Sequence, residues 1–336
     1  MVSLMKPRVL IFGGRDKGIA YHRLFAPLEH LERGEYIELK SYESWKDKDL
    51  QEGWKWATHI VISRHMGVAY KDIASVADVC TITGKRLIVD VDDWWYIPAH
   101  HPKYRMYQTY KVPQQIERTI QCAHEVWTTT KHLAKKIRKL NKNVVIIPNA
   151  IDTEVEQWKN HAKPDRPVTF GYIGAGFHHH DIEWAELDLR DVPSIVPDLD
   201  GEIYMEMTRA SKGYKWHSPT EYGNIYREFD VSLVPLSSNE FNKCKSPLKL
   251  AEAAFTNTAL IIRDVKPYSG YLRHEKNCLV ANTPQEFKEA IRRLKNDREK
   301  VIELADNLRR DFQHWEMDAV NQKRLDRLYN GQYPIS

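Results

Sequence analysis

Short apolar runs alternate with helical segments along this chain of 336 residues. Six runs in the first half have the length and residue types of buried strands, namely 8–14, 36–42, 58–64, 86–93, 124–130 and 144–150. Five similar runs follow in the second half, at 168–174, 201–207, 230–236, 258–264 and 277–282. Because the same alternation occurs twice, the sequence predicts an α/β chain with two doubly wound domains and parallel sheets.

A polar stretch with two prolines, 152–167, separates the two halves and has the composition of a linker. We therefore expect a Rossmann-like domain over 1–155, a linker over 156–167 and a second Rossmann-like domain over 168–310. Doubly wound domains bind ligands at the carboxyl ends of their strands, so the cleft between the two domains is the expected site.

The composition is that of a soluble globular protein, with 42% hydrophobic and 29% charged residues. The longest apolar runs have strand length, so no integral membrane contact is expected, and the N-terminus lacks a signal-peptide layout. The four cysteines lie far apart, which argues against a zinc site or a disulfide framework and favours the reducing cytoplasm. The formal net charge of +4 permits an acidic partner without requiring one.

A polar loop and a helix start follow the apolar run 231–236. Ser246 is a suitable N-cap and Pro247 suits the first helical position. Lys245, Lys249 and Glu252 then fall near one face of the first two turns. Two lysines at a helix N-terminus suit a diphosphate, and the carboxylate suits the hydroxyls of a ribose. The same spacing also fits an amphipathic helix whose lysines are only solvated.

Three carboxylates cluster at the end of the fourth predicted strand. Alternation places Asp90 and Asp92 on one side, with Asp93 at the strand exit. Such a cluster could act as a base, hold sugar hydroxyls or bind a metal, and Trp94 and Trp95 could stack on a sugar or a base. Alternatively, an aspartate here only caps the next segment. We favour a functional role without direct metal binding.

The first predicted strand ends in two glycines, but the G-x-G-x-x-G pattern is absent, so no NAD-type site is expected. Arg23, near the start of the next helix, is expected to face the cleft and to bind a phosphate or an acceptor. Alternatively, it pairs at the surface.

In the second half, Gly174 and Gly176 would let the backbone approach a ligand closely. Three adjacent histidines follow, but consecutive side chains do not readily point at one ion. We therefore interpret His178 or His180 as a phosphate or hydroxyl contact. The segment 131–143 has six Lys or Arg residues and no acid. It is interpreted as a solvated helix face, or else as a contact with nucleic acid or an anionic surface.

Taken together, these segments resemble the group 1 type of GT-B glycosyltransferases, the retaining nucleotide-sugar enzymes. They resemble more closely a compact branch found in bacterial and phage genomes. The resemblance rests on an ordered set of motifs: Tyr21–Arg23, DVDDWW, TTTKHL, IIPNAID, GYIGAGFHHHD, FNKCKSPLKLAE and the pair Pro267 and Tyr268. The set covers nearly the whole chain and is far more specific than any single motif.

The resemblance implies two Rossmann-like domains facing a cleft, with a C-terminal helix over 311–336 that returns to the first domain. The second domain would hold a nucleotide-sugar donor of the UDP type. Lys245, Ser246 and Lys249 would contact the diphosphate and Glu252 the ribose, while His178 and Asp181 match the family's His and Asp positions. Gly174 and Gly176 would also lie against the donor.

The acceptor hydroxyl would enter from the first domain near Arg23 and Asp92, beside Tyr21, Asp93, Trp94 and Trp95. Asp92, Arg23 and His178 would be the catalytic residues. The chemistry would need no metal and no cofactor besides the donor, because positive groups and helix dipoles stabilise the leaving diphosphate. We expect Lys249→Ala or Glu252→Ala to weaken donor binding and to leave the fold intact.

The chain departs from the family pattern at two positions. The wider family pairs two glutamates eight positions apart, and here the partner of Glu252 is Cys244. A glycine that usually follows the helix is replaced by Asn257, which also adopts left-handed conformations.

The acceptor is a bacterial glycan, a lipid-linked sugar or a hydroxymethylated base in phage DNA, the last implying the host cytoplasm. The rival interpretations are a non-catalytic GT-B protein that binds a nucleotide or glycan, and a nucleotide-sugar epimerase. The sugar and the oligomeric state stay open.

Overall fold

The computed structural model describes residues 5–15, 18–43, 47–64, 73–159, 163–174, 178–198 and 204–330. The chain forms two compact units. The first comprises Met1–Asp152, Cys244–Ser246 and Met317–Ser336, and the second comprises Thr153–Lys243 and Pro247–Glu316. Among the described residues, no helix combines the length and the apolar composition that crossing a membrane requires.

The first unit contains a parallel six-stranded sheet with the order β2-β1-β3-β4-β5-β6. Its strands are β1 (Arg8–Phe12), β2 (Glu38–Tyr42), β3 (His59–Ser63), β4 (Arg86–Val91), β5 (Glu125–Thr128) and β6 (Val144–Ile146). All six strands predicted for the first half are therefore confirmed. β3, β4 and β5 are almost wholly buried, as expected for strands covered by helices on both faces.

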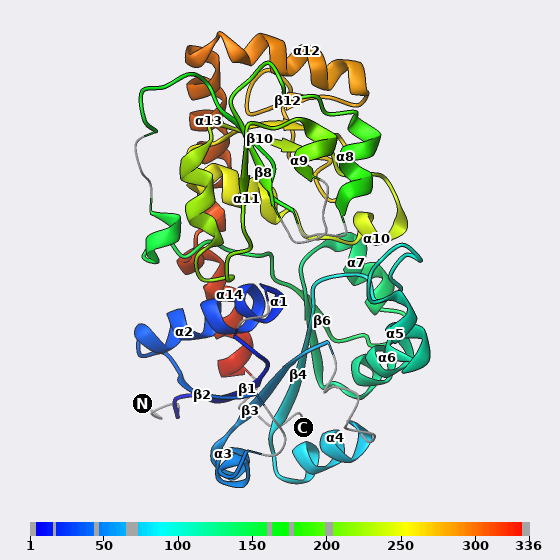
Figure 1. Ribbon diagram of the computed structural model, residues 1–336. Coiled ribbons are helices and arrows are strands. Elements are labelled where there is room, and N and C mark those ends of the chain that lie inside the picture. The colour runs from blue at the N-terminus through cyan, green and yellow to red at the C-terminus, as the bar shows by residue number, and fades with distance from the viewer. Residues whose placement is uncertain are drawn as a thin grey trace. The chain divides into compact units, whose positions relative to one another are not determined.

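Helices cover both faces of this sheet, with α2 and α14 on one side and α4, α5 and α6 on the other (Figure 1). The helices of the first unit are α1 (Gly18–Ala20), the π-helix η1 (Tyr21–Phe25), α2 (Ala26–Arg33), α3 (Leu50–Trp56), α4 (Ile73–Ile82), α5 (Tyr104–Thr109), α6 (Val112–Cys122), α7 (Lys131–Ile137) and α14 (Met317–Asn330). The core joins Leu28 of α2 and Val320 of α14 to Ile11 of β1. The C-terminal helix thus belongs to the first unit by packing.

The second unit contains a parallel six-stranded sheet with the order β12-β11-β10-β7-β8-β9. Its strands are β7 (Phe170–Gly171), β8 (Ser194–Pro197), β9 (Lys212–Tyr214), β10 (Val231–Val234), β11 (Ala259–Ile262) and β12 (Leu279–Val280). The strand predicted at 201–207 is wrong. Residues 201–203 lie outside the described part, and Tyr204–Thr208 form a helix whose Tyr204 and Thr208, four residues apart, are both buried. β8 and β9 were not predicted.

Helices also cover the second sheet, with α11 and α13 on one side and α8 and α9 on the other (Figure 1). The helices are η2 (Glu156–Trp158), α8 (His179–Ala185), α9 (Tyr204–Thr208), η4 (Tyr222–Glu228), α10 (Glu240–Lys243), α11 (Leu248–Phe255), α12 (Pro284–Lys295), α13 (Arg298–Phe312) and η5 (Gln313–Trp315). Asn257 follows α11 with φ 49°, so it takes the left-handed conformation expected at that position.

Each sheet has one place where the strand order reverses. The first chain half builds β1 and β2 and then continues with β3 on the other side of β1. The second half builds β7, β8 and β9 and then continues with β10 on the other side of β7. In open α/β sheets the carboxyl ends of the strands at such reversals are the usual ligand sites. The reversals therefore point to the loops after β1 and β3 and to those after β7 and β10.

Candidate active site

A buried aspartate joins the loops after β7 and β10 in the second unit. Asp181 in α8 is 4% exposed, and its Oδ2 lies 2.7 Å from His178 Nδ1. Its Oδ1 accepts a hydrogen bond of 2.8 Å from the backbone N–H of Ser237. Burial alone raises the pKa of Asp181, but His178 and the Ser237 donors outweigh burial and lower it. Asp181 is therefore an anion that orients His178 at the strand reversal.

Gly174 in the same loop lies close to a buried ring. A Cβ built on Gly174 would press on the hydroxyl end of Tyr172, so a larger residue here would need that ring to shift. The other glycine singled out in the sequence, Gly176, lies outside the described residues.

A second buried carboxylate lies near the start of α11. Glu252 is 1% exposed, and its Oε2 accepts hydrogen bonds from Lys249 Nζ at 2.8 Å and from the Tyr226 hydroxyl at 2.7 Å. The Tyr222 hydroxyl donates to its Oε1. Burial raises the pKa of Glu252, but Lys249 and the two hydroxyls outweigh it and lower the pKa. Neither tyrosine was identified from the sequence, because both come from η4, far from α11 in the chain.

The start of α11 differs from the prediction. The helix begins at Leu248, and Pro247 precedes it with a ψ of 37°, so Pro247 does not occupy the first helical position. The Ser246 side chain does not cap the helix. Its Oγ accepts a hydrogen bond of 2.7 Å from Asn149 Nδ2 of the first unit, and both Lys245 and Ser246 belong to that unit. The predicted cap is therefore wrong, because the serine hydroxyl is held by the loop after β6.

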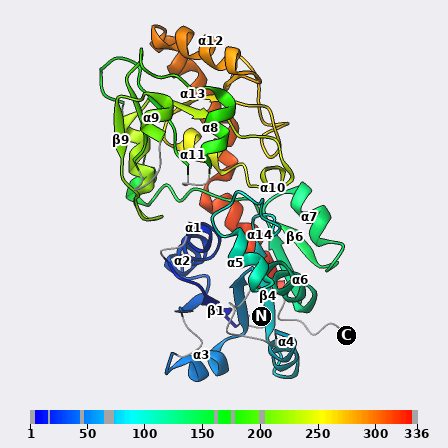
Figure 2. The same ribbon diagram turned by 45° about the vertical axis from the view of Figure 1, so that its right-hand side comes forward.

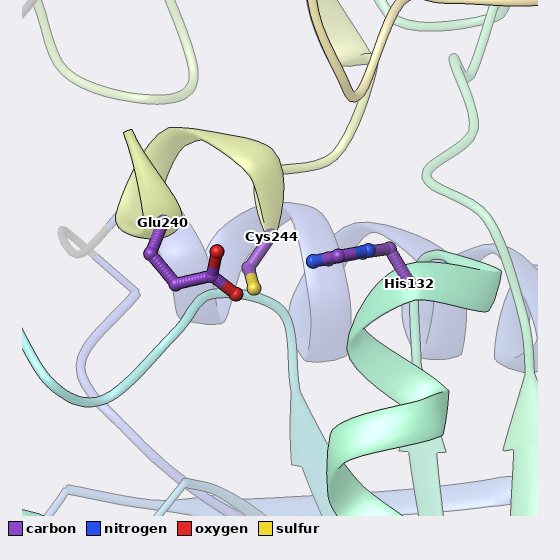
Figure 3. A group of neighbouring side chains, drawn as sticks. All are labelled: His132, Glu240 and Cys244. Carbon is purple, nitrogen blue, oxygen red and sulfur yellow. The ribbon is translucent and has the colours of Figure 1, made fainter. Parts of the chain in front are cut away.

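Cys244 also belongs to the first unit, where its side chain is fully buried. Figure 3 shows the imidazole of His132, from α7, directed toward Cys244, and the ligand atoms of the two residues lie within 4.8 Å of one another. Glu240, drawn in the same figure, belongs to the second unit. The position at which the resemblance expects a glutamate thus carries a small thiol inside the protein.

Arg23 is buried inside the first unit rather than facing an open site. Its Nε and Nη2 donate to the two carboxylate oxygens of Asp90 at 2.9 and 2.8 Å, and neither side chain is more than 1% exposed. Its Nη1 donates to the backbone oxygen of Ile147 and to Oδ1 of Asn149, each at 2.9 Å. This geometry corrects the expectation of a ligand contact, since Arg23 holds the loop that carries Asn149.

Arg64, which the sequence did not single out, holds the carboxylates after β4. Its Nε and Nη2 donate to Asp92 Oδ1 at 3.1 and 2.9 Å, and Nη2 also donates to Asp93 at 3.2 Å. Among the described residues, no hydrogen bond reaches Asp92 Oδ2. Burial raises the pKa of Asp92, Arg64 opposes the shift, and Asp93 and Asp90 add to it. Asp92 is thus a buried carboxylate with one oxygen open to a further donor.

The aromatic residues expected near an acceptor differ in exposure. Tyr21 is 4% exposed within the core, and Trp95 is 1% exposed, with its Nε1 donating to Glu117 at 3.2 Å. These two positions correct the expectation of a direct ligand contact. Trp94 is half-buried, with its ring centroid 4.4 Å from that of Trp95 and 4.4 Å from Lys136 Nζ. Of the three rings, only Trp94 keeps an accessible part.

Among the described residues, one group of side chains within a single unit has ligand atoms close enough together to hold a metal ion, and it lies in the histidine run. The ligand atoms of His179, His180 and Glu183 lie within 4.8 Å of one another. His180 Nδ1 already pairs with Glu183 at 2.8 Å on the protein surface. Neighbouring surface ion pairs of this kind are common without a metal, so the cluster is no argument for one.

The fold is shared with several solved structures. Sucrose-phosphate synthase from Thermosynechococcus elongatus superposes with a TM-score of 0.65 at 12% identity, over 98% of this chain and 100% of that chain. HepE from Anabaena in complex with UDP-glucose gives 0.62 at 12% identity, over 96% and 99%. A glycosyltransferase from Rickettsia africae gives 0.61 at 10% identity, over 99% and 100%.

The sequence comparisons match a smaller part of the chain than the structural comparisons do. No curated protein matches the sequence. Residues 183–329 match a family model described as glycosyl transferase-like. That match covers most of the second unit and α14, including Glu252 and its two tyrosines. With its two parallel six-stranded sheets and these structural neighbours, the chain has the GT-B fold of two-domain glycosyltransferases.

Proposed function

We propose that this protein is a glycosyltransferase that moves a sugar from a nucleotide-sugar, of the UDP type, to an acceptor hydroxyl with retention of the anomeric configuration. The observation that carries the proposal is the second unit's strand reversal, where Asp181 orients His178 and accepts a hydrogen bond from Ser237 in the loop after β10. Ligands of doubly wound domains bind at such reversals. The family match over 183–329 and the solved HepE complexes with UDP and UDP-glucose support this reading.

The second unit would bind the donor. The Lys249 side chain is partly exposed and its Nζ is held by Glu252, so it is suited to a diphosphate oxygen. Glu252 would bind the ribose after a ribose hydroxyl replaces that of half-buried Tyr222. His178, oriented by Asp181, would contact the transferred sugar or the leaving phosphate. Lys245 and Ser246 belong to the first unit, and for them a diphosphate contact stays a prediction of the resemblance.

The first unit would bind the acceptor. Asp92 Oδ2 would accept a hydrogen bond from the acceptor hydroxyl, while Arg64 keeps Oδ1 in place. Asp93 and the accessible part of Trp94 would lie beside the acceptor. Arg23 would act indirectly, because it orients Asn149 and through it Ser246. Bringing both substrates together in one orientation would supply much of the rate acceleration.

Calorimetric titration with UDP, GDP and ADP tests the donor site directly. We expect UDP to bind best and Lys249→Met to weaken it on the order of a hundredfold, the loss typical of a charged hydrogen bond to phosphate together with its orienting partners. Lys295→Met, an exposed lysine on α12, is the matched control. Unchanged UDP affinity in Lys249→Met would refute the site assignment.

A panel of UDP- and GDP-sugars with mixed glycan and nucleic-acid acceptors tests the reaction. Release of nucleotide that depends on an acceptor supports transfer, and NMR of the product reports the anomeric configuration. Nucleotide binding without any turnover would instead favour a non-catalytic binding protein. This is the leading alternative, because Cys244 stands where the resemblance expects a glutamate. Interconversion of nucleotide-sugars without an acceptor would indicate an epimerase.

A further inference from the structure

Positive charge is concentrated in one continuous part of the first unit. Residues 94–151 contain ten Lys and Arg side chains against two carboxylates, a net charge of +8, whereas the whole chain carries +4. Glu125 is fully buried against Arg86 and Arg327, and Glu117 is half-buried with the donors of Trp95 and Tyr96. The solvent therefore meets no exposed carboxylate in this stretch, while nine of its ten basic side chains are exposed.

Contacts tie the basic helix α7 to an aromatic loop. Lys136 of α7 places its Nζ 4.4 Å from the ring centroid of Trp94, and the Trp94 ring lies 5.5 Å from that of Tyr96. The Tyr96 hydroxyl donates to Glu117 of α6 at 2.9 Å. Figures 1 and 2 both show α5 beside α6. We define the basic–aromatic surface by groups of this loop, of α5 with the residues that flank it, and of α7. It comprises the half-buried Trp94 and the exposed residues Tyr96, Lys103, Arg105, Met106, Tyr110, Lys111, Lys131 and Lys135.

The exposed apolar groups of the basic–aromatic surface are mainly rings. Tyr96 is 42% and Tyr110 54% exposed, and Met106 on α5 is the one exposed large aliphatic side chain there. The apolar residues Leu133, Ala134 and Ile137 of α7 are buried, so α7 offers only its lysines and part of His132 to solvent. An interfacial membrane helix needs an apolar face to insert into the bilayer. α7 has none to offer.

We infer that the basic–aromatic surface binds single-stranded nucleic acid. Exposed rings interleaved with lysines and arginines match the two requirements of such binding, because bases stack on aromatic faces and phosphates pair with cations. A strand bound there would lie on the same unit as Asp92. The inference rests on the proposed function only for the role of that strand, as an acceptor whose base or sugar carries the reacting hydroxyl.

Fluorescence anisotropy with a labelled 20-nucleotide DNA strand, without any sugar donor, tests the surface. The charge variant Lys131→Glu with Lys135→Glu changes two exposed lysines on one face of α7. We expect it to bind at least about tenfold more weakly and to lower the salt slope by about 1.4, the loss of two phosphate contacts to a single strand. Tyr110→Ala should weaken binding on the order of tenfold through lost stacking.

Two control variants lie on the second unit. Arg292→Glu with Lys295→Glu on α12 makes the same charge change, and Trp216→Ala removes a ring that is 65% exposed. Both should bind like the unmodified protein. The inference is overturned if the strand does not bind at low salt, if the control variants lose as much affinity, or if only the charge variant loses affinity. It is also overturned if vesicles with anionic lipid displace the strand.

The two proposals fail separately. Strand binding with the expected variant pattern but no sugar transfer from any nucleotide-sugar would leave the inference standing and refute the proposed enzyme. Transfer to a glycan without strand binding would do the reverse.

Discussion

Asp92 in the first unit and Glu252 in the second are both buried carboxylates with a cationic partner, yet their pKa values shift in opposite directions. Glu252 receives donors on both oxygens, from Lys249, Tyr222 and Tyr226, and its pKa is lowered. Asp92 receives Arg64 on one oxygen and has two other carboxylates nearby, and its pKa is raised. The number of donors to the ionised form therefore decides the shift, and burial alone does not.

The two carboxylates also differ in whether a ligand hydroxyl can bind to them without displacing another donor. Glu252 is saturated, so a ribose hydroxyl must displace one that is already bound to it. Asp92 keeps Oδ2 without a hydrogen bond among the described residues, so an acceptor hydroxyl would add to its contacts. In the proposed enzyme, donor binding would therefore replace an existing hydrogen bond to Glu252, whereas acceptor binding would add a new hydrogen bond to Asp92.

Removing Glu252 should have the largest effect. Glu252→Ala leaves the hydroxyl of fully buried Tyr226 without its acceptor, so we expect a loss of about 3 kcal/mol in the free energy of unfolding. Urea denaturation measures it, with exposed Glu299→Ala as the control. This revises the expectation that only donor binding suffers. A variant as stable as the control would mean that the network contributes nothing to folding.

Asp92→Asn should act on catalysis more than on stability. Asparagine retains an oxygen that accepts from Arg64, but the negative charge offered to an acceptor hydroxyl is lost. We expect kcat to fall at least about a hundredfold, as for the loss of a positioned acid–base group. Steady-state kinetics with an identified acceptor measures it, and UDP affinity should not change. If KM for the acceptor rises and kcat does not, Asp92 only binds the acceptor.

The fold could be predicted from the sequence in large part. The apolar runs predicted ten of the twelve strands in the described part of the chain, and most of these ten are buried, although the edge strands β2 and β6 are not. β8 and β9 escaped, since one is four residues ending in proline and the other is a three-residue edge strand with no apolar alternation. The overpredicted strand at 201–207 contains Ile203 and Tyr204, whose residue types suit a strand, although Tyr204–Thr208 form α9.

The sequence predicted several carboxylates of the candidate site, but it did not predict the residues that donate hydrogen bonds to them. The sequence pattern pointed to Asp92 after a strand and to Glu252 in the second turn of a helix, and the resemblance pointed to Asp181. Their donors come from elsewhere: Arg64 from the loop after β3, Ser237 from the loop after β10 and the two tyrosines from η4. Such pairings depend on tertiary packing, which also buries Arg23 and Trp95. Spacing along one segment carries no information about them.

Tyr226→Phe is a smaller change that tests whether saturation keeps Glu252 ionised. One of the donors is lost, so the pKa of Glu252 should rise and the stability should fall by about 2 kcal/mol. A lowered pKa contributes stability that is lost as the pH falls through the folded-state value. The Phe variant should therefore lose this contribution at a higher pH than the parent protein. Urea denaturation between pH 4 and pH 7 measures it, and parallel curves would contradict the saturation argument.

The smallest expected effect concerns Arg64→Lys, which keeps the charge beside Asp92 but removes the two-pronged contact. We expect a stability loss of about 1 kcal/mol and a further rise in the pKa of Asp92. Because that pKa is already raised, the folded state holds the proton more tightly than the unfolded chain, and Asp92 lowers stability as the pH rises through this window. The acid limb of kcat/KM should accordingly move to higher pH in Arg64→Lys. Exposed Arg118→Lys on α6 is the control, and an acid limb that stays in place would show that Arg64 does not set the charge of Asp92.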